Sequence, residues 1–296
     1  MQLREANDAE ILERNHLTYE EWGGLLSAQQ YLDREQLLRV EAFSRGMTTW
    51  LWCQGDDVLA SCETYACDSQ LDGQPGVTWA FASVFTEKAL RGNGYATKMM
   101  DAVVERLSQR AHAQACVLFS DVGERIYARS GFIPGPAQDW VLPPQHGAPE
   151  KGVVPLDGPL TIDRSVLRRD GLVLPPSAEQ LDWMFAREAF YAQALNRQRP
   201  SFRGAHAADA QAIWAANYKN SELVVLWLDG KDTQLVLRAA QRQAWRCGLE
   251  RVRMWAIPES PKPETATALA RDGELPMYRA FRPVTGWFHV QRALWV

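Results

Sequence analysis

The residues best suited to bind a ligand lie between an apolar run, Val77 to Phe85, and an amphipathic segment that begins near Gly94. The turn between them, residues 91–96, reads Arg-Gly-Asn-Gly-Tyr-Ala. Glycines let a backbone approach phosphate oxygens closely, and the first N–H groups of a helix have no partner within it. The helix dipole favours negative charge there, and an arginine adds a charged donor. This order of strand, glycine-rich turn and helix therefore predicts a pyrophosphate site.

Two common nucleotide motifs do not fit this turn. The Walker phosphate loop needs Lys and then Ser or Thr after its last glycine, where this chain has Tyr95 and Ala96. The dinucleotide fingerprint Gly-x-Gly-x-x-Gly fails because Thr97 stands at the position of its third glycine. The pattern that fits is Arg-x-x-Gly-x-Ala at Arg91, Gly94 and Ala96. It resembles the acyl-CoA loop of the GCN5-related N-acetyltransferase (GNAT) superfamily.

A second motif follows the turn at residues 119–132, which read Phe-Ser-Asp-Val-Gly-Glu-Arg-Ile-Tyr-Ala-Arg-Ser-Gly-Phe. Members of the GNAT superfamily typically carry a strand that ends in Asn or Asp, then a short helix with a tyrosine and a following Gly-Phe. Tyr127 and the pair Gly131-Phe132 match that pattern. Two ordered motifs at the right spacing indicate an acyl-CoA-dependent acyltransferase.

Other segments look like the fungal lysine acetyltransferases of lysine breakdown. They include Glu-Trp-Gly at 21–23, Tyr-Leu-Asp-Arg-Glu at 31–35, and Phe-Ala-Arg-Glu-Ala-Phe at 185–190. The chain departs from that family at Phe185-Ala186, where two aromatic or imidazole residues usually precede the Arg-Glu pair, and at its last residues, 292–296. We expect these departures to affect which amine is acetylated more than the type of reaction.

The resemblance implies a reaction in which a neutral amine attacks the thioester of acetyl-CoA. That reaction needs a phosphate anchor, donors for the developing oxyanion, and groups that move protons. The backbone near Val84 and Phe85 would pair with the pantetheine arm, and Tyr127 resembles the residue that protonates the leaving thiolate. The residues expected to bind the cofactor are Ser83, Val84, Phe85, Arg91, Gly92, Asn93, Gly94, Tyr95, Ala96 and Thr97.

The general base has several candidates. Asp121 ends the strand beside the expected acyl site, and Glu63 lies on a strand next to the cofactor strand. A terminal carboxylate at Val296 or a water chain would also serve. Sequence alone leaves these alternatives open.

The acceptor pocket is expected to be shaped by the second half of the chain. Arg187 and Glu188 could bind the carboxylate and the amine of an amino acid. The tryptophans considered for the pocket wall are Trp255, Trp287 and Trp295.

The order of elements predicts two copies of one fold. A strand at 223–228, a helix at 233–247 and a strand at 251–257 repeat the order found around the glycine turn. The loop of this copy, Asp-Gly-Lys-Asp at 229–232, would repel a pyrophosphate, so only the first copy should bind the cofactor. We expect a GNAT fold of α/β (α+β) class, with a mixed, mostly antiparallel sheet flanked by helices. The predicted parts are a GNAT domain at 1–140, a proline-rich linker at 141–177 and a degenerate GNAT-like domain at 178–296.

Composition narrows the possible partners. The net charge of −4 and the absence of a Lys/Arg-rich run argue against a nucleic-acid partner. The five cysteines have no Cys-x-x-Cys spacing, so no metal site is expected, and the cysteines indicate a reducing compartment. The polar start and the lack of an 18-residue apolar run predict a cytoplasmic protein without a membrane span. A monomer or a homodimer is expected.

Three functions therefore compete. The first is an acetyl-CoA-dependent N-acetyltransferase for a small amine, above all a lysine-like amino acid. The second is an acetyltransferase for a specialised metabolite, antibiotic or toxin. The third is a non-catalytic acyl-CoA sensor or scaffold, which the intact motifs at Arg91, Gly94, Ala96 and Tyr127 argue against.

Overall fold

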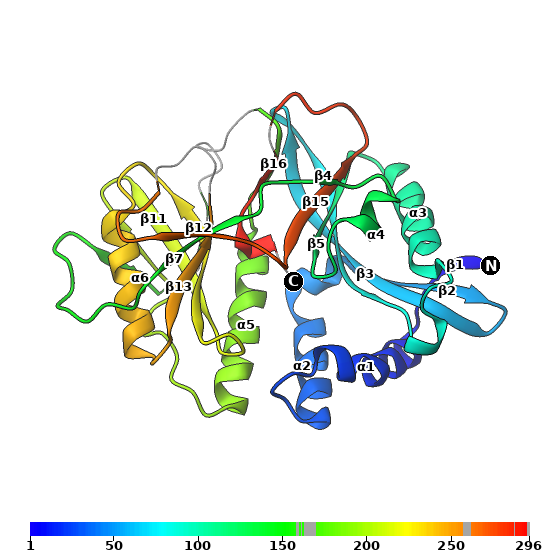
Figure 1. The fold of residues 1–296 in the computed structure, drawn as a ribbon, viewed down its shortest axis with the longest axis horizontal. Coiled ribbons are helices and arrows are strands. Elements are labelled where there is room, and N and C mark those ends of the chain that lie inside the picture. The colour runs from blue at the N-terminus through cyan, green and yellow to red at the C-terminus, as the bar shows by residue number, and fades with distance from the viewer. Residues whose placement is uncertain (158–159, 161, 163–169, 257–261, 287, 295–296) are drawn as a thin grey trace.

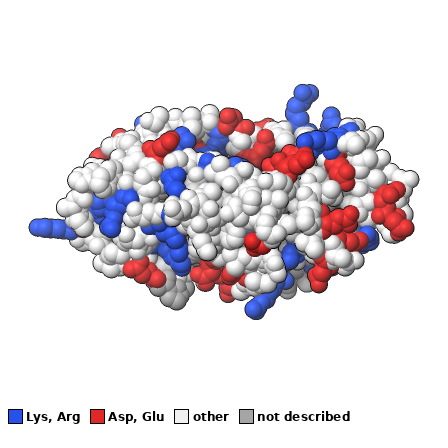
Figure 2. Space-filling view, turned by 90° about the horizontal axis from the view of Figure 1, so that it is seen from below, with Lys and Arg blue, Asp and Glu red and all other residues white. Residues whose placement is uncertain are grey.

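The computed structural model describes residues 1–157, 160, 162, 170–256, 262–286 and 288–294 of the 296-residue chain. Two twisted sheets form the two halves of the described part, and helices α2 and α5 lie side by side between them (Figure 1). Basic and acidic side chains are interspersed on the face seen from below (Figure 2). None of the helices in the described ranges is both long and apolar enough to span a membrane.

The first sheet has the strand order β1-β2-β3-β4-β5-β15-β6, with β9 paired to both β3 and β16. Its strands are β1 (Gln2–Glu5), β2 (Met47–Gln54), β3 (Asp57–Leu71), β4 (Gln74–Phe85), β5 (Ala113–Ser120), β6 (Ile133–Pro134), β9 (Leu172–Leu174), β15 (Leu275–Ala280) and β16 (Phe288–Val290).

The second sheet has the strand order β14-β7-β13-β12-β11-β10-β8. Its strands are β7 (Gln138–Leu142), β8 (Val154–Leu156), β10 (Gly204–Ala207), β11 (Ala210–Asn217), β12 (Glu222–Asp229), β13 (Arg251–Trp255) and β14 (Thr267–Ala270).

Helices cover these sheets and fill the space between them. The α-helices are α1 (Asp8–Trp22), α2 (Ala28–Val40), α3 (Tyr95–Ser108), α4 (Arg125–Ala128), α5 (Ala178–Ala194) and α6 (Gln234–Arg246). Short 3-10 helices are η1 (Ala42–Gly46), η2 (Lys88–Leu90) and η4 (Arg292–Leu294).

The same unit occurs in both halves, as the sequence predicts. Strand β4 leads through α3 to the parallel strand β5, and β12 leads through α6 to the parallel strand β13. On α3 the apolar residues Met99, Met100, Val103, Val104 and Leu107 are buried against the first sheet. Burial of such side chains stabilises a fold by about 1.5–3 kcal/mol each, so this stripe fixes α3 on the first sheet.

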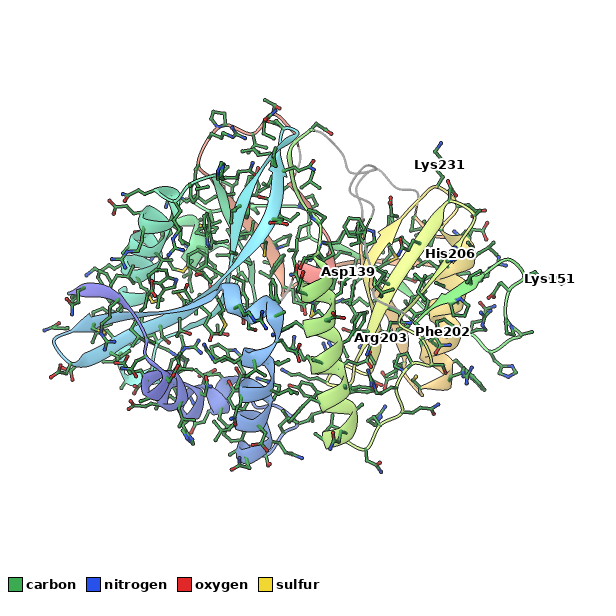
Figure 3. All side chains as sticks on the ribbon, turned by 180° about the vertical axis from the view of Figure 1, so that it is seen from behind. Asp139, Lys151, Phe202, Arg203, His206 and Lys231 are labelled. Carbon is green, nitrogen blue, oxygen red and sulfur yellow. The ribbon has the colours of Figure 1, made fainter. Side chains whose placement is uncertain are left out.

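The two halves of the chain exchange strands. β7 pairs antiparallel with β13 in the second sheet, and β15 pairs antiparallel with β5 in the first. Asp139 of β7 is completely buried near the centre of the molecule (Figure 3), where its carboxylate contacts Arg253 at 2.6 Å and Arg271 at 3.0 Å. The division at residues 140 and 178 stays a prediction about folding units, because the sheets themselves share strands across it.

Candidate active site

The glycine turn ends on a helix start that offers free N–H groups. Gly94 is the N-cap of α3 with a φ of 73°, and Gly92 has a φ of 85°. Helices α1, α2 and α5 are capped by Asn7, Ser27 and Ser177, whereas α3 has no side-chain cap. A Cβ added at either glycine would meet nothing within 4 Å. The glycines are therefore needed for their left-handed backbone, and the space above the turn is open to an anion.

Arg91 directs its guanidinium toward the end of α1. Its Nη2 lies 2.6 Å from Oε1 of Glu21, and its Nε donates to the carbonyl oxygen of Thr86 at 2.9 Å. The hydrogen bond from Arg91 holds the pKa of Glu21 below its usual range. Asn93 donates instead to the Leu90 carbonyl oxygen at 2.9 Å and, unlike its neighbours in the turn, does not line the cavity described below.

Strands β4 and β5 diverge beside this turn. Their parallel pairing covers Val77–Ala80 on β4 and Ala113–Val117 on β5, whereas β15 stays paired with β5 as far as Ser120. Among the described residues, therefore, no strand lies beside the edge of β4 at 81–85 on the β5 side. Such an edge presents backbone donors and acceptors to an extended ligand. Val84 and Phe85 both lie along this edge and line the cavity, which suits a pantetheine arm.

A β-bulge interrupts β4 at the same place. The register changes between the pairs Ser61–Phe85 and Glu63–Ala82, so residues 83 and 84 oppose a single residue of β3. Ser83 has a φ of 51°, a conformation that is uncommon for a residue other than glycine. Bulges of this kind turn the backbone groups of one strand away from its neighbour.

Arg14 on α1 holds the bulge from the side of β3. Its Nη2 donates to the Ser83 carbonyl oxygen at 2.7 Å, and its Nε donates to Oγ of Ser61 at 3.0 Å. Its Nη1 lies 3.5 Å from Oε1 of Glu63, which also accepts from Arg39 at 3.0 Å. The buried Glu63 carboxylate is thus tied to two guanidinium groups next to the bulge, in the wall of the cavity.

Tyr127 on α4 lines the same cavity as the open edge of β4. Burial, together with the smaller effects of Cys62 and Asp121 nearby, raises the pKa of Tyr127 to about 12. The phenol therefore keeps its proton at neutral pH and can donate it. Its ring packs edge-on against Phe132, with 6.5 Å between centroids, so the Gly-Phe of the second motif orients the tyrosine.

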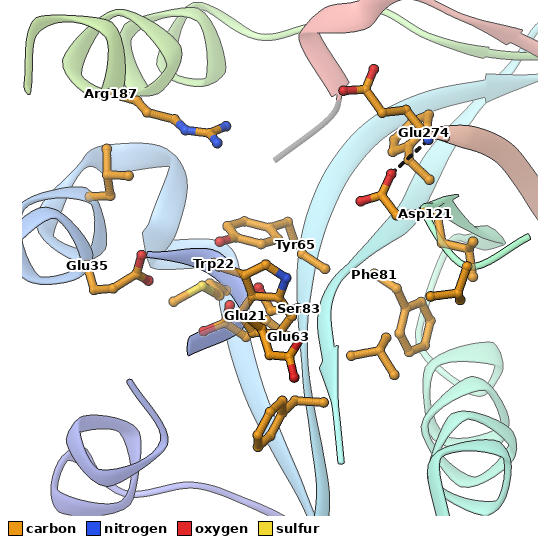
Figure 4. A pocket seen from close by; sticks show the side chains of 18 of the residues that line it. Glu21, Trp22, Glu35, Glu63, Tyr65, Phe81, Ser83, Asp121, Arg187 and Glu274 are labelled. Carbon is orange, nitrogen blue, oxygen red and sulfur yellow. Dashed lines mark hydrogen bonds between the residues drawn. The ribbon is translucent and has the colours of Figure 1, made fainter. Parts of the chain in front are cut away.

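Asp121 stands at the end of β5 and also lines the cavity. Its Oδ1 accepts a hydrogen bond from the backbone N–H of Glu274 at 2.8 Å (Figure 4). The bond joins the residue just after β5 to the residue just before the exchanged strand β15. One carboxylate oxygen is thereby occupied, and the residue helps to fix the divergence of β5 from β4.

A cavity of about 930 Å³ connects these groups with the second half of the chain. Its walls come from the glycine turn, the facing edges of β4 and β5, helices α2 and α5, and part of β11. Ligand sites have volumes of this order and bring a few polar groups into an apolar wall. Figure 4 shows Arg187 and Glu35 directed into the space from α5 and α2, with Tyr65 and Ser83 nearby.

The predicted pair Arg187 and Glu188 divides into two different environments. Arg187 extends into the cavity, and burial lowers its pKa to about 10, so the guanidinium is charged at neutral pH. Glu188 is buried, its Oε1 accepts from Nε of Arg199 at 2.9 Å, and its Oε2 accepts from the N–H of Ala216 at 3.1 Å. Both Glu188 oxygens therefore tie α5 to its surroundings, although the residue lines the cavity.

Trp255 is buried beside the cavity without being one of its lining residues. Its ring lies 5.0 Å from that of Phe119, and the guanidinium of Arg292 lies over it at 5.6 Å. Phe119 and Arg292 are cavity residues, so Trp255 supports the wall from behind. The remaining acceptor-site candidates, Trp287, Trp295 and the terminal carboxylate of Val296, lie outside the described residues.

Several residues at the cavity are not indicated by any motif in the sequence. Arg34 on α2 donates to the hydroxyl of Tyr191 on α5 at 2.5 Å and is also paired with Glu35. Segments 21–23 and 31–35 contribute to the family resemblance, but nothing in their sequence assigns Glu21 or Glu35 to a site. Arg14, which holds the bulge without lining the cavity, also has no pattern around it in the sequence that indicates this role. Within the described ranges, no cluster of His, Cys, Asp and Glu has the arrangement of a metal site.

An open strand edge with a bulge, a diverging parallel neighbour and an uncapped helix start define the acyl-CoA N-acyltransferase fold. Residues 12–132 match the model of the acetyltransferase (GNAT) family, and residues 168–275 match the LYC1 GNAT-like C-terminal domain. These matches place the chain in the GNAT superfamily, as an acetyltransferase of GNAT type. Enzymes of this family use acetyl-CoA. None of the curated proteins matches the sequence.

Solved structures show the same two-part fold. A GCN5-related N-acetyltransferase from Anabaena variabilis superposes with a TM-score of 0.62 at 12% identity, over 95% of this chain and 73% of that one. One from Kribbella flavida gives a TM-score of 0.59 at 17% identity, over 95% and 72%. A tandem GNAT protein from the clavulanic acid biosynthesis pathway gives 0.51 at 12% identity, over 95% and 99%. The prediction of a two-copy GNAT fold is confirmed.

Proposed function

We propose that this protein transfers the acetyl group of acetyl-CoA to an amine of a lysine-like amino acid. The observation that carries the proposal is the continuous cavity, which is lined by the glycine turn and Tyr127 at one end and by Arg187 at the other. The pyrophosphate would bind the free N–H groups at the start of α3. The pantetheine arm would pair with the β4 edge up to the bulge.

The chemistry at the bulge is an acyl transfer. The amine nitrogen forms a bond to the acetyl carbon, the carbon–sulfur bond breaks, and the thiolate takes the phenolic proton of Tyr127. Backbone N–H groups near Val84 would polarise the thioester carbonyl, because donors aimed at developing charge stabilise the transition state. The attacking nitrogen becomes positively charged when its bond to the acetyl carbon forms, and it releases one proton to water as the amide is made. The tyrosinate regains one proton from water, so the protons balance.

The ammonium form of the acceptor must lose a proton before it attacks. In Figure 4, Glu63 lies beside Ser83 on the same side of the cavity as Tyr65, whereas Asp121 lies across from them beside Glu274. We therefore assign the role of proton acceptor, through a water molecule, to Glu63. Asp121 is the alternative, and the two assignments predict different variants to fail.

The acceptor end of the cavity offers charges of both signs. Arg187 suits the α-carboxylate of an amino acid, because a guanidinium binds a carboxylate through paired hydrogen bonds. Glu35 faces the space from the opposite helix and suits the ammonium group that is not acetylated. An acceptor with one carboxylate and two amines matches this pattern, and the buried oxygens of Glu188 take no part in it.

Release of free thiol from acetyl-CoA, followed across amino acids, polyamines and aminoglycosides, tests the proposal. We expect turnover with basic amino acids and little with polyamines, which have no carboxylate for Arg187. Turnover with aminoglycosides alone would support the specialised-metabolite alternative. Binding of acetyl-CoA in a calorimeter with no thiol release on any amine would identify an acyl-CoA sensor.

A further inference from the structure

The second half of the chain contains the same diverging strands as the first. β12 and β13 pair only through Glu222–Val224 and Arg251–Arg253, although β12 continues to Asp229. β13 meanwhile stays paired with β7 as far as Trp255. The far part of β12 therefore corresponds to the β4 edge that we assign to the pantetheine arm.

The side chain of Gln291 occupies this second edge. Its Oε1 accepts from the N–H of Leu228 at 2.8 Å, and its Nε2 donates to the carbonyl oxygen of the same residue at 3.0 Å. One amide group thus satisfies both backbone groups of one strand residue, as an amide of a bound extended ligand would. The following residues Ala293 and Leu294 are fully buried, and Gln180 donates to the Ala293 carbonyl oxygen at 3.0 Å.

Groups of the protein itself also occupy the turn before α6. The N–H of Gly230 donates to the carboxylate of Asp229 at 2.8 Å, and the N–H of Lys231 donates to that of Asp209 at 3.4 Å. A Cβ at Gly230 would lie 2.3 Å from the Asp209 carbonyl oxygen, whereas the first turn is open above both of its glycines. Lys231 extends away from the body of the molecule (Figure 3).

We propose that Gln291–Leu294 takes the place of an acyl-CoA arm in the second half, and that this fixes the wall of the acceptor cavity. The segment carries Arg292, which lines the cavity and donates to Oε1 of Glu274 at 2.9 Å. Gln291 is thus a positioning residue for the acceptor, and this role rests on the proposed function. The second half then holds no acyl-CoA of its own.

Calorimetry with coenzyme A tests the first part without any turnover. We expect one ligand per chain, and binding at least about tenfold weaker after Ala96→Asp, which puts a carboxylate at the first turn as Asp229 and Asp209 do at the second. Ala28→Asp, in the first turn of the exposed start of α2, is the matched control and should bind normally. Two ligands per chain would overturn the inference and leave the proposed function standing. One ligand whose affinity is unchanged in Ala96→Asp would overturn the inference and also the placement of the cofactor at the first turn. No binding to the unmodified protein would instead refute the proposed function.

Kinetics test the positioning role. Gln291→Met keeps the length of the side chain but removes both hydrogen bonds, so we expect the KM for the acceptor to rise about fivefold or more while the KM for acetyl-CoA stays within about twofold. Gln291→Glu keeps an oxygen that accepts from the Leu228 N–H, so its KM for the acceptor should lie between those of Gln291→Met and the unmodified protein. Gln193→Met, on the exposed face of α5, is the control. An unchanged acceptor KM in Gln291→Met would overturn the role, and if that variant does not fold, an unchanged acceptor KM in Gln291→Glu would do so.

Discussion

Glu21 and Arg91 form an ion pair that joins the end of α1 to the glycine turn, with 2.6 Å between Oε1 and Nη2. Both side chains line the cavity, and both are partly open to solvent, at 32% and 47% exposure. A carboxylate therefore holds the arginine that we expect to meet the pyrophosphate. Binding of acetyl-CoA has to compete with this carboxylate, and the competition can be measured.

Glu21→Gln should tighten acetyl-CoA binding. Loss of the carboxylate frees Arg91 and removes a negative charge near the phosphates, so the KM for acetyl-CoA should fall by about two- to fivefold, the range for an exposed pair. Glu20→Gln breaks the neighbouring pair with Lys88, which lies outside the cavity, and should have little effect. A weaker binding of acetyl-CoA in Glu21→Gln would show that the pair organises the site instead.

Ala96→Asp should raise the KM for acetyl-CoA at least about tenfold without loss of folding. Aspartate is favoured in the first turn of a helix, so the thermal midpoint should stay near that of the unmodified protein. The same charge would repel the pyrophosphate. Equal KM values for the two proteins in steady-state assays would place the cofactor away from this turn.

Tyr127→Phe should lower kcat by about a hundredfold or more, because general acid catalysis commonly contributes that much. Dissociation constants for acetyl-CoA measured by calorimetry should not change. Since the pKa of Tyr127 is raised to about 12, its proton is lost only as the pH rises toward that value. The kcat of the unmodified enzyme should thus show no loss of this acid between about pH 7 and about pH 10. Full turnover in the variant would remove Tyr127 from the mechanism.

Arg187→Met should raise the KM for a basic amino acid by about tenfold to a hundredfold, because a charge-assisted bond to the carboxylate is lost. A diamine of the same length has no carboxylate, so its KM should be the same for Arg187→Met and for the unmodified protein. Arg197→Met removes an exposed arginine just beyond the same helix and provides the control. Similar losses on both acceptors would indicate that Arg187 acts only on the fold of α5.

Glu63→Gln should lower kcat at about pH 7 by roughly a hundredfold. The loss should shrink at higher pH, where more of the free acceptor has already lost its proton. Arg39→Met keeps the Glu63 carboxylate but removes one of its ion-pair partners. Comparison of the two variants therefore separates the effect of lost proton transfer from that of a lost ion pair. Asp121→Asn can still accept the hydrogen bond from the Glu274 N–H, and its kcat should fall much less. A pH-dependent loss in Asp121→Asn alone would transfer the role of base to Asp121.

Residue types that are close together in the chain set the local features of this protein. Left-handed backbone at Gly92 and Gly94, the helix start after them and the buried stripe of α3 all follow from local residue types. The same holds for the repeat of strand, helix and strand in the second half. These local patterns also carried the resemblance that placed Tyr127.

The contacts between residues far apart in the chain depend on the tertiary fold. The exchange of β7 and β15 and the packing of α2 against α5 join segments that are far apart in the chain. Neighbours such as Arg187 and Glu188 point about 100° apart on a helix, so only packing shows which one reaches the cavity. Gln291 on the edge of β12 is likewise invisible in sequence, because a single side-chain amide on a strand edge leaves no periodic pattern.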